Sequence, residues 1–256
     1  MTDELKKRIM LLAQKYEVNE FLNDDPSRFM HRYSAVVDKE VVAFLAANLA
    51  FGNRKQILSH IEIILSCITD SNLSPREWIL SERYKSFCEN DLHKTFYRMY
   101  TYQDLLLFFD AIRAILQESE SLGNYFRQKW LISQNKNEPY LHQLVAKSFP
   151  KECALISHCK SGAAKKLNML LRWLVRDNSP VDLGLWKWYD KKKLLIPLDT
   201  HVMSVAHSWG LIKSKGANLK TAIELTDKMR NVFPDDPVKA DFALFGLGVN
   251  TRSQDE

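Results

Sequence analysis

The sequence has few of the residues that interrupt helices and few of the patterns that build strands. Its 256 residues include only eight glycines and eight prolines. Runs in which apolar and polar residues alternate between turn residues, the pattern of a half-buried strand, are nearly absent. No apolar run approaches the roughly 18 residues that a membrane-spanning helix needs. These absences argue against a β-rich fold and against a membrane partner.

Cysteine is also scarce, and its spacing fits no metal site. The four cysteines are Cys67, Cys88, Cys153 and Cys159, and only the last two lie close in sequence. Their spacing matches neither a zinc site nor an iron–sulfur cluster. The first 15 residues are charged and amphipathic and lack the apolar core of a secretory signal. We therefore expect a cytoplasmic protein with reduced thiols, without a metal or other cofactor.

The charge balance is mildly basic. The 36 lysines and arginines exceed the 31 acidic residues, which gives a formal net charge of +5. Such a balance permits a nucleic-acid partner without requiring one. Hydrophobic residues make up 46% of the chain, which is enough for a sizeable core, and a charged fraction of 26% argues against disorder.

Helical periodicity is what the sequence has in abundance. Apolar residues recur at spacings of three and four, and capping residues stand before several of these runs. We expect Asp3 to cap the first helix, Asp38 the next and Thr101 a later one. We predict a compact all-α, multi-helix fold in a single domain over residues 1–256, with two lobes as an open alternative. The predicted helices include 41–51, 54–68, 104–116, 122–130, 140–148 and 202–209, with short loops at 135–139 and 177–180.

The features that indicate chemistry lie in residues 159–210. The first stretch reads CKSGAAKKLNMLLRWLVR, in which Ser161 and Gly162 predict a tight turn and a helix follows at once. Lys165 and Lys166 lie in its first turn. Because consecutive helical residues point about 100° apart, only one of them can face a given site. Backbone N–H groups at such a helix start suit an anion such as a DNA phosphate.

The second stretch reads LLIPLDTHVMSVAHSWGL. Pro197 indicates a helix start, and either Asp199 or Thr200 is expected to cap the helix that Gly210 ends. A carboxylate at a helix N-terminus is stabilised by the helix dipole and by N–H donors. Asp199 is therefore well placed as an electrostatic or basic group.

The order of these two stretches resembles the helix-hairpin-helix DNA glycosylases, such as endonuclease III and 8-oxoguanine DNA glycosylase. The phrases RWLVR and IPLDTHV also closely resemble an uncharacterised bacterial family related to that superfamily. The resemblance extends to residues 38–52, similar to an early core helix, and to 236–248, similar to the closing helix. It implies an N-glycosylase that removes a damaged base from double-stranded DNA. The long interval between Lys165 and Asp199, similar to that of an archaeal branch, favours 8-oxoguanine.

The resemblance also implies roles for single residues. Lys165 corresponds to the nucleophile that attacks the sugar C1′ and forms a Schiff base, which permits an AP-lyase step as well, and Lys166 is the alternative. Asp199 corresponds to the carboxylate that supports the developing charge. His201 and Arg172 are expected to line the site. Further DNA contacts are expected from Ser161, Gly162, Ala163, Lys166, Lys191, Lys192 and Lys193, although the last three also fit a solvated loop.

Two departures from the family keep other readings open. The turn holds one glycine where the family has two, and no cysteine follows Cys159, so we predict no iron–sulfur cluster. One alternative is a catalytically weak or inactive DNA-binding protein on the same fold. Another is a helical hydrolase or scaffold unrelated to DNA, and RNA is an alternative to DNA. We expect a monomer, with Trp173, Trp186 and Trp188 in the core and Arg172 and Arg176 at the rim of Trp173.

Overall fold

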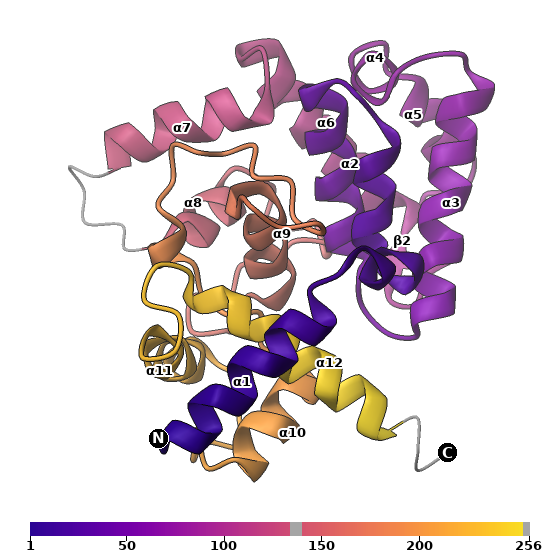
Figure 1. Ribbon diagram of the computed structural model, residues 1–256. Coiled ribbons are helices and arrows are strands. Elements are labelled where there is room, and N and C mark those ends of the chain that lie inside the picture. Colours follow the sequence, from indigo (N-terminus) through magenta and orange to yellow (C-terminus); the bar gives the residue numbers. More distant parts are fainter. Residues whose placement is uncertain (134–139, 253–256) are drawn as a thin grey trace. The chain divides into compact units, whose positions relative to one another are not determined.

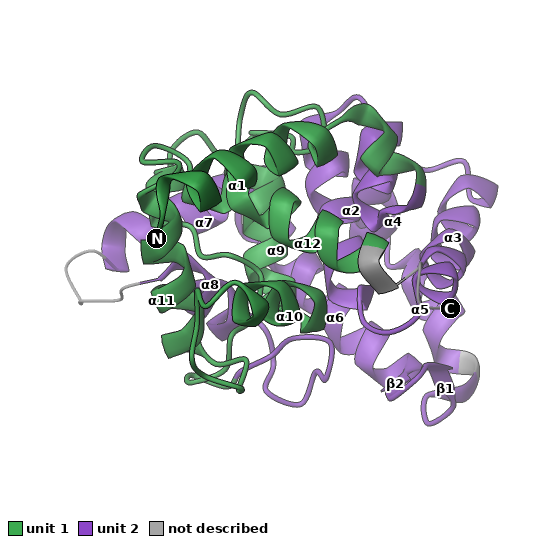
Figure 2. Cartoon of the chain, turned by 60° about the horizontal axis from the view of Figure 1, so that its bottom comes forward, with its two compact units in different colours: residues 1–23, 159–256 green, residues 24–158 purple. Residues whose placement is uncertain are grey.

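The computed structural model describes residues 1–133 and 140–252, apart from the side chains of Asn90, Thr251 and Arg252. The predicted loop at 135–139 lies outside the described residues. The fold is all-α, as predicted, with a single short hairpin in the described part of the chain (Figure 1). Contacts divide the chain into two compact units (Figure 2). Unit 1 consists of residues 1–23 and 159–256, and unit 2 of residues 24–158.

Unit 2 is built around helix α2 (Val36–Leu49). This helix is apolar nearly all round and is buried along most of its length, which requires other elements on every side. Helices α3, α4 and α7 and the short 3-10 helix η2 supply these neighbours. The elements of unit 2 are η2 (Pro26–Arg32), α2, α3 (Arg54–Asp70), α4 (Pro75–Leu80), α5 (Arg83–Cys88), η3 (Glu89–Asp91), β1 (Thr95–Tyr97), β2 (Tyr100–Thr101), α6 (Tyr102–Glu118), α7 (Leu122–Ser133) and α8 (Leu141–Lys147).

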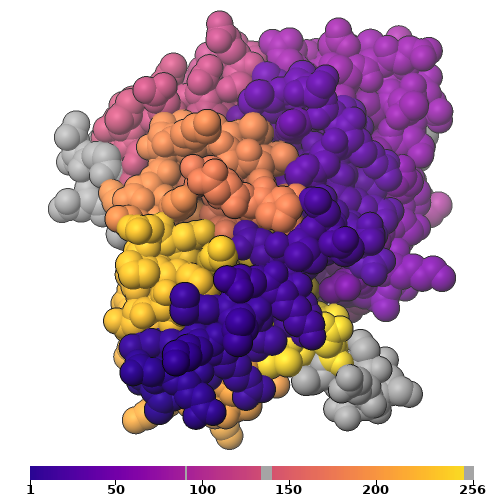
Figure 3. All heavy atoms as spheres, in the orientation of Figure 1, coloured from indigo at the N-terminus to yellow at the C-terminus, as the bar shows by residue number. Residues whose placement is uncertain are grey.

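Unit 1 joins the two ends of the chain in one core. Helix α12 packs against both α1 and α10 (Figure 1). In Figure 3 the indigo atoms of α1 accordingly lie against yellow atoms from the last part of the described chain. The elements are α1 (Asp3–Tyr16), η1 (Asn19–Asp24) at the boundary, α9 (Lys165–Val175), η5 (Lys191–Lys193), α10 (Thr200–Ser208), α11 (Leu219–Arg230), η6 (Pro237–Lys239) and α12 (Ala240–Arg252). Of the helices described, none combines the length and apolar character needed to cross a membrane.

The predicted helix caps are correct at α6 and wrong at two other helices. Thr101 caps α6 and forms a reciprocal capping box with Asp104. The prediction of Asp38 is wrong because the apolar run extends back to the start of α2, and its carboxylate instead accepts a hydrogen bond from the Arg76 N–H (2.9 Å) in α4. The prediction of Asp3 is also wrong, since the hydroxyl of Thr2 accepts the N–H of Leu5 and Asp3 is already helical.

The β1–β2 hairpin is not predicted by the sequence pattern. Thr95 pairs with Thr101 and Tyr97 with Tyr100 in antiparallel register. Strands of two and three residues are too short to show the alternation by which a strand is recognised. Arg98 takes the turn in the left-handed conformation, with φ of 53°.

Candidate functional site

The turn before α9 and the helix that follows it have the predicted form. The N–H of Gly162 donates to the carbonyl of Cys159 (3.2 Å), and α9 follows directly. The residue before the helix, Ala164, has φ of 46° and ψ of 43°, a left-handed conformation that is uncommon for a residue with a Cβ atom. Residues 148–164, all of them described, contain no helix. A helix therefore follows the turn but none leads directly into it.

The turn is held against the start of α11. The N–H of Leu219 donates to the carbonyl of Ser161 (2.8 Å), and Gly162 forms an isolated bridge with Asn218. Ser161 is exposed and Gly162 half-buried, while Ala163 is buried. Of the three turn residues expected to contact DNA, only Ser161 and Gly162 present surface to a partner.

Lys165 and Lys166 are both half-buried at the first turn of α9. Their directions differ. Lys165 is separated from Arg172 by nearly two full turns, so the two lie only about 20° apart around the helix axis, whereas Lys166 lies about 120° from Arg172. Arg172 forms an ion pair with Asp241 of α12. Lys165 therefore projects from the side of α9 that faces α12.

Asp199 is the N-cap of α10, which decides between the two predicted capping residues. Its Oδ1 accepts the N–H groups of His201 (2.9 Å) and Val202 (2.8 Å). The residues just before it, Pro197 and Leu198, are buried, while Asp199 itself is half-buried. In the described part of the chain, nothing donates a hydrogen bond to its Oδ2. The carboxylate is thus fixed through one oxygen and accessible through the other.

His201 anchors the start of α10 to α12. Its Nδ1–H donates to the carbonyl of Gly248 (3.0 Å), and its ring meets Phe245 edge to face. A Cβ atom at Gly248 would stand 2.9 Å from the Cβ of His201, so the two helices approach closely at this glycine. The imidazole serves the packing of α10 on α12, and its expected role in lining the site stays a prediction.

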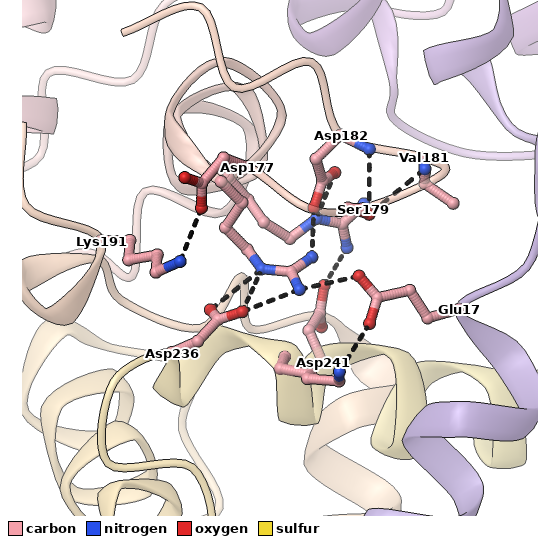
Figure 4. Close-up of polar contacts among 11 residues, drawn as sticks. Glu17, Asp177, Ser179, Val181, Asp182, Lys191, Asp236 and Asp241 are labelled. Atoms are coloured by element: carbon pink, nitrogen blue, oxygen red, sulfur yellow. Dashed lines mark hydrogen bonds and ion pairs between the residues drawn. The ribbon is translucent and has the colours of Figure 1, made fainter. Parts of the chain in front are cut away.

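Behind these residues lies a buried network of ion pairs (Figure 4). Arg172 pairs with Asp182 (3.2 Å) and with Asp241. Arg176 pairs with Asp182, Glu17 (2.7 Å) and Asp236 (2.8 Å). The prediction that both arginines lie at the rim of Trp173 is wrong. They are 3% and 1% exposed, because the carboxylates allow guanidinium groups to lie in the core. Arg172 is linked to the candidate site through Asp241, which interacts electrostatically with Asp199.

Asp199 and this network are electrostatically linked. Burial raises the pKa of Asp241 to about 6; Arg172 opposes this shift, and the charge of Asp199 contributes to it. Burial likewise raises the pKa of Asp182, although Arg172 and Arg176 oppose the shift. Lys239 also pairs with Glu17 (3.5 Å), so the four carboxylates of the network exceed its three cations by one, and Asp199 adds a further carboxylate. Such an excess suits a cation or a developing positive charge.

The basic run Lys191–Lys193 forms a short 3-10 turn rather than a loose loop. Asp190 caps it by accepting the N–H of Lys192 (2.9 Å). Lys191 pairs with Asp177 (2.6 Å) and Lys192 with Asp235 (2.7 Å), while Lys193 is exposed. Ion pairs this exposed are worth little, so a phosphate could replace either carboxylate. Contact with DNA stays a prediction.

The tryptophans near the site lie mostly in the core. Trp173 and Trp186 are 0% and 1% exposed, so their predicted place is confirmed. Trp188 is half-buried and stacks on Trp186 at 5.5 Å between ring centroids. Within the described residues, no group of three or more His, Cys, Asp or Glu side chains could hold a metal ion.

Sequence reasoning did not identify the acidic partners Glu17, Asp182, Asp236 and Asp241. The available signal was the pair Arg172 and Arg176, four residues apart in a helix that is otherwise apolar after its first turn. Two guanidinium groups on a buried helix need carboxylate partners. The sequence does not say which of the 31 acidic residues provide them.

Comparison with known proteins identifies a family but no activity. A model of the family DUF2400, described as a protein of unknown function, matches residues 25–250. The match covers most of the chain, which therefore belongs to this family. No curated protein and no solved structure shows significant similarity to the chain.

Proposed function

We propose that this member of the DUF2400 family is a DNA N-glycosylase that removes a damaged base, with Lys165 as nucleophile and Asp199 as the supporting carboxylate. The observation that carries the proposal is the carboxylate of Asp199. It is fixed by two backbone N–H groups at the start of α10 and keeps one oxygen accessible. It belongs to the same compact unit as Lys165.

Asp199 would act by electrostatic stabilisation. When the bond between C1′ and the base breaks, the base leaves with the electron pair and positive charge develops on the sugar. A carboxylate already held in place stabilises this charge without having to reorganise. The carboxylate of Asp241, which interacts electrostatically with Asp199, would add to this stabilisation. The geometry of Asp199 also supports a glycosylase that does not use Lys165 covalently.

Lys165 would form the covalent intermediate. Its amine nitrogen forms a bond to C1′ and gives up a proton, and opening of the sugar ring leaves a Schiff base. Such an adduct also permits strand scission, which is the AP-lyase step. Helix geometry favours Lys165 over Lys166, because Lys165 shares the face of α9 from which Arg172 reaches α12.

The proposed partner is double-stranded DNA with the damaged nucleotide flipped out of the stack. The exposed Ser161 and the basic residues of Lys191–Lys193 are the proposed phosphate contacts in unit 1. The proposed lesion is an oxidised purine such as 8-oxoguanine, because the segment between Lys165 and Asp199 is similar in length to that of an archaeal branch of 8-oxoguanine glycosylases.

Borohydride trapping tests the proposal. The wild-type protein is incubated with duplexes that each carry one lesion or one abasic site, beside Lys165→Gln, Lys166→Gln and Asp199→Asn. We expect a covalent adduct that Lys166→Gln keeps and Lys165→Gln abolishes. Asp199→Asn should slow base release but still trap on the abasic duplex. An adduct that survives Lys165→Gln would assign the nucleophile to another residue. The absence of both adduct and base release with every duplex would overturn the proposal.

A DNA-binding protein without efficient catalysis is the second candidate. The turn before α9 favours it, since no helix occupies residues 148–164 and Ala164 takes a conformation that glycine adopts more easily. This candidate predicts salt-dependent affinity for a duplex together with neither trapping nor base release.

A further inference from the structure

Unit 2 contains a cavity that takes no part in the proposed site. Its volume is about 350 Å³, which is within the range of small-molecule sites, and it lies among α3, α4 and α5 (Figure 1). These helices belong to unit 2, whereas Lys165 and Asp199 belong to unit 1. The cavity is lined by Cys67, Ser71, Trp78, Arg83, Ser86 and Phe87.

The two aromatic side chains of the lining are held in place by other rings. Trp78 packs edge to face on Phe109, with 5.2 Å between the ring centroids. Phe87 packs against Phe96 at 5.9 Å and against Tyr102 at 5.5 Å. Rings fixed in this way form an apolar surface before any ligand arrives, and such a surface suits a flat aromatic group.

The two serines of the lining offer acceptors rather than donors. The hydroxyl of Ser71 donates to the carbonyl of Ile68 (2.6 Å), and the hydroxyl of Ser86 donates to the carbonyl of Arg83 (2.8 Å). Each hydroxyl has a single proton, so its oxygen lone pairs are what remains for a ligand. These oxygens can accept a hydrogen bond from an N–H or O–H group.

The donors of the cavity are Trp78 and Arg83. Trp78 is 2% exposed, and its indole N–H has no acceptor among the described residues. The guanidinium of Arg83 is exposed and forms neither an ion pair nor a hydrogen bond within the described part of the chain. Arg83 differs from other exposed cations because it lines a cavity, and it is the charged member of that lining. An oxygen acceptor on a ligand would satisfy both donors.

The acidic residues close to the cavity do not line it. Glu82 precedes the arginine in sequence, but its carboxylate pairs with Lys85 and Arg113. Burial raises the pKa of the Cys67 thiol, and the charge of Asp70 contributes to the shift. Asp70 is exposed at the end of α3. The charge that the lining itself presents to a ligand is therefore positive.

We propose that this cavity binds a small planar aromatic carboxylate. The ring of the ligand packs on Trp78 and Phe87, and its carboxylate accepts hydrogen bonds from Arg83 and from the indole N–H. A hydroxyl or N–H group on the ring donates to Ser71 or Ser86. The proposal does not depend on the proposed function, since it uses other residues in the other unit.

Calorimetric titration of the full-length protein with 6-hydroxy-2-naphthoate is the direct test. This probe carries the aromatic ring, the carboxylate and a ring hydroxyl. Arg83→Gln should weaken its binding about tenfold or more, the loss of a charged hydrogen bond, and Trp78→Phe about threefold. The neutral 6-hydroxy-2-naphthamide should bind the wild-type protein about tenfold more weakly than the carboxylate. The absence of binding by the carboxylate, or equal affinity for both probes, would overturn the proposal.

The chain provides matched controls for charge. Arg127 is exposed on α7 in the same unit, forms no ion pair with a described residue and does not line the cavity. Arg127→Gln should therefore keep the wild-type affinity, and an equal loss in this variant would overturn the proposal. Asp70→Asn should not weaken binding. A greater loss in Asp70→Asn than in Arg83→Gln would identify a cationic ligand and would also overturn it.

The thiol of Cys67 reports occupancy of the cavity without any substitution. Cys67 lines the cavity and is half-buried, whereas Cys159 is exposed in unit 1 and serves as the control within the same molecule. The rate at which N-ethylmaleimide labels each thiol is followed by mass spectrometry. A probe concentration ten times the Kd should slow labelling of Cys67 about tenfold and leave Cys159 unchanged. Protection of both thiols, or of neither, would overturn the proposal.

Borohydride trapping separates this site from the glycosylase mechanism. Arg83→Gln should give the wild-type amount of adduct on an abasic duplex, and Lys165→Gln should bind the probe normally. Probe binding without trapping in the wild-type protein overturns the glycosylase mechanism alone. Trapping without probe binding overturns the proposed cavity ligand alone.

Discussion

Replacement of Arg176 by methionine is expected to destabilise unit 1 strongly. Arg176 is 1% exposed and pairs with Asp182, Glu17 and Asp236. Methionine fills most of the same length but carries no charge and donates no hydrogen bond. The substitution therefore leaves the three carboxylates in place and removes the cation that they share.

The size of the expected loss of stability follows from the burial of those carboxylates. The side chain of Asp182 is fully buried and that of Glu17 is 5% exposed, so water cannot replace the lost guanidinium. Removal of one partner from a buried ion pair costs about 3–5 kcal/mol. Asp182 keeps Arg172, which places the expected loss in the lower half of that range. Since a domain is stable by only about 5–15 kcal/mol, the loss is a large fraction of the total.

The loss should depend on pH in a defined direction. Burial raises the pKa of Asp182, and Arg176 opposes the shift, so without Arg176 the pKa of Asp182 in the folded variant lies further above the unfolded value of about 4. A folded state that binds more protons than the unfolded state gains stability as the pH falls. The deficit of Arg176→Met should therefore be largest at mildly basic pH and shrink in mild acid.

Urea unfolding of both proteins at several pH values, followed by tryptophan fluorescence and circular dichroism, measures this deficit. Arg230→Met is the matched control, because its pair with Asp227 is exposed and should be worth less than about 1 kcal/mol. A loss for Arg176→Met as small as that of the control, or a deficit that is constant with pH, would refute the reasoning.

Two further predictions concern Gly52 and Asp241. Gly52→Ala should lower the melting temperature, with a loss of stability of about 1–3 kcal/mol. The reasons are that φ of 107° is strained for alanine and that its Cβ would stand 2.9 Å from the hydroxyl oxygen of Tyr97. An unchanged melting temperature would count against this prediction. The pKa of Asp241 is raised to about 6, so the stability that this carboxyl contributes is present below the unfolded pKa of about 4 and is lost as the pH rises through about 6. Asparagine cannot titrate, so the free energy of unfolding of Asp241→Asn relative to wild type should rise by about 1–3 kcal/mol between about pH 4 and pH 6, as measured by urea titration. A difference between the two proteins that does not vary with pH would contradict this prediction.

Local signals explain why the helices could be predicted. The nearly uniform apolar character of the α2 sequence requires burial on all sides, and Thr101 and Asp199 cap the helices that follow them. These features depend on residues within a few positions of one another. The hairpin has no such signal, because strands of two and three residues show no periodicity.

The candidate site likewise contains one feature that local sequence predicts and one that it does not. The N-cap role of Asp199 could be predicted, since the donors are the next N–H groups along the chain. The network could not, because the bond from Arg176 to Glu17 joins residues 159 positions apart. Arg172 and Arg176 indicate that partners are needed, but the choice of partner is set by tertiary packing.

This long-range network bears on the proposed chemistry because it joins α9, which begins at Lys165, to α12, the helix against which α10 also packs. Lys165 begins α9, and α9 is joined to α12 by Arg172 and Asp241. Asp199 begins α10, and α10 is joined to α12 by His201. Neither of the two proposed reactive residues lies on α12, yet each begins a helix that is joined to α12. A site whose groups must be held to within about 0.5 Å requires support of this kind, so the buried ion pairs that cost desolvation are consistent with a function in fixing geometry.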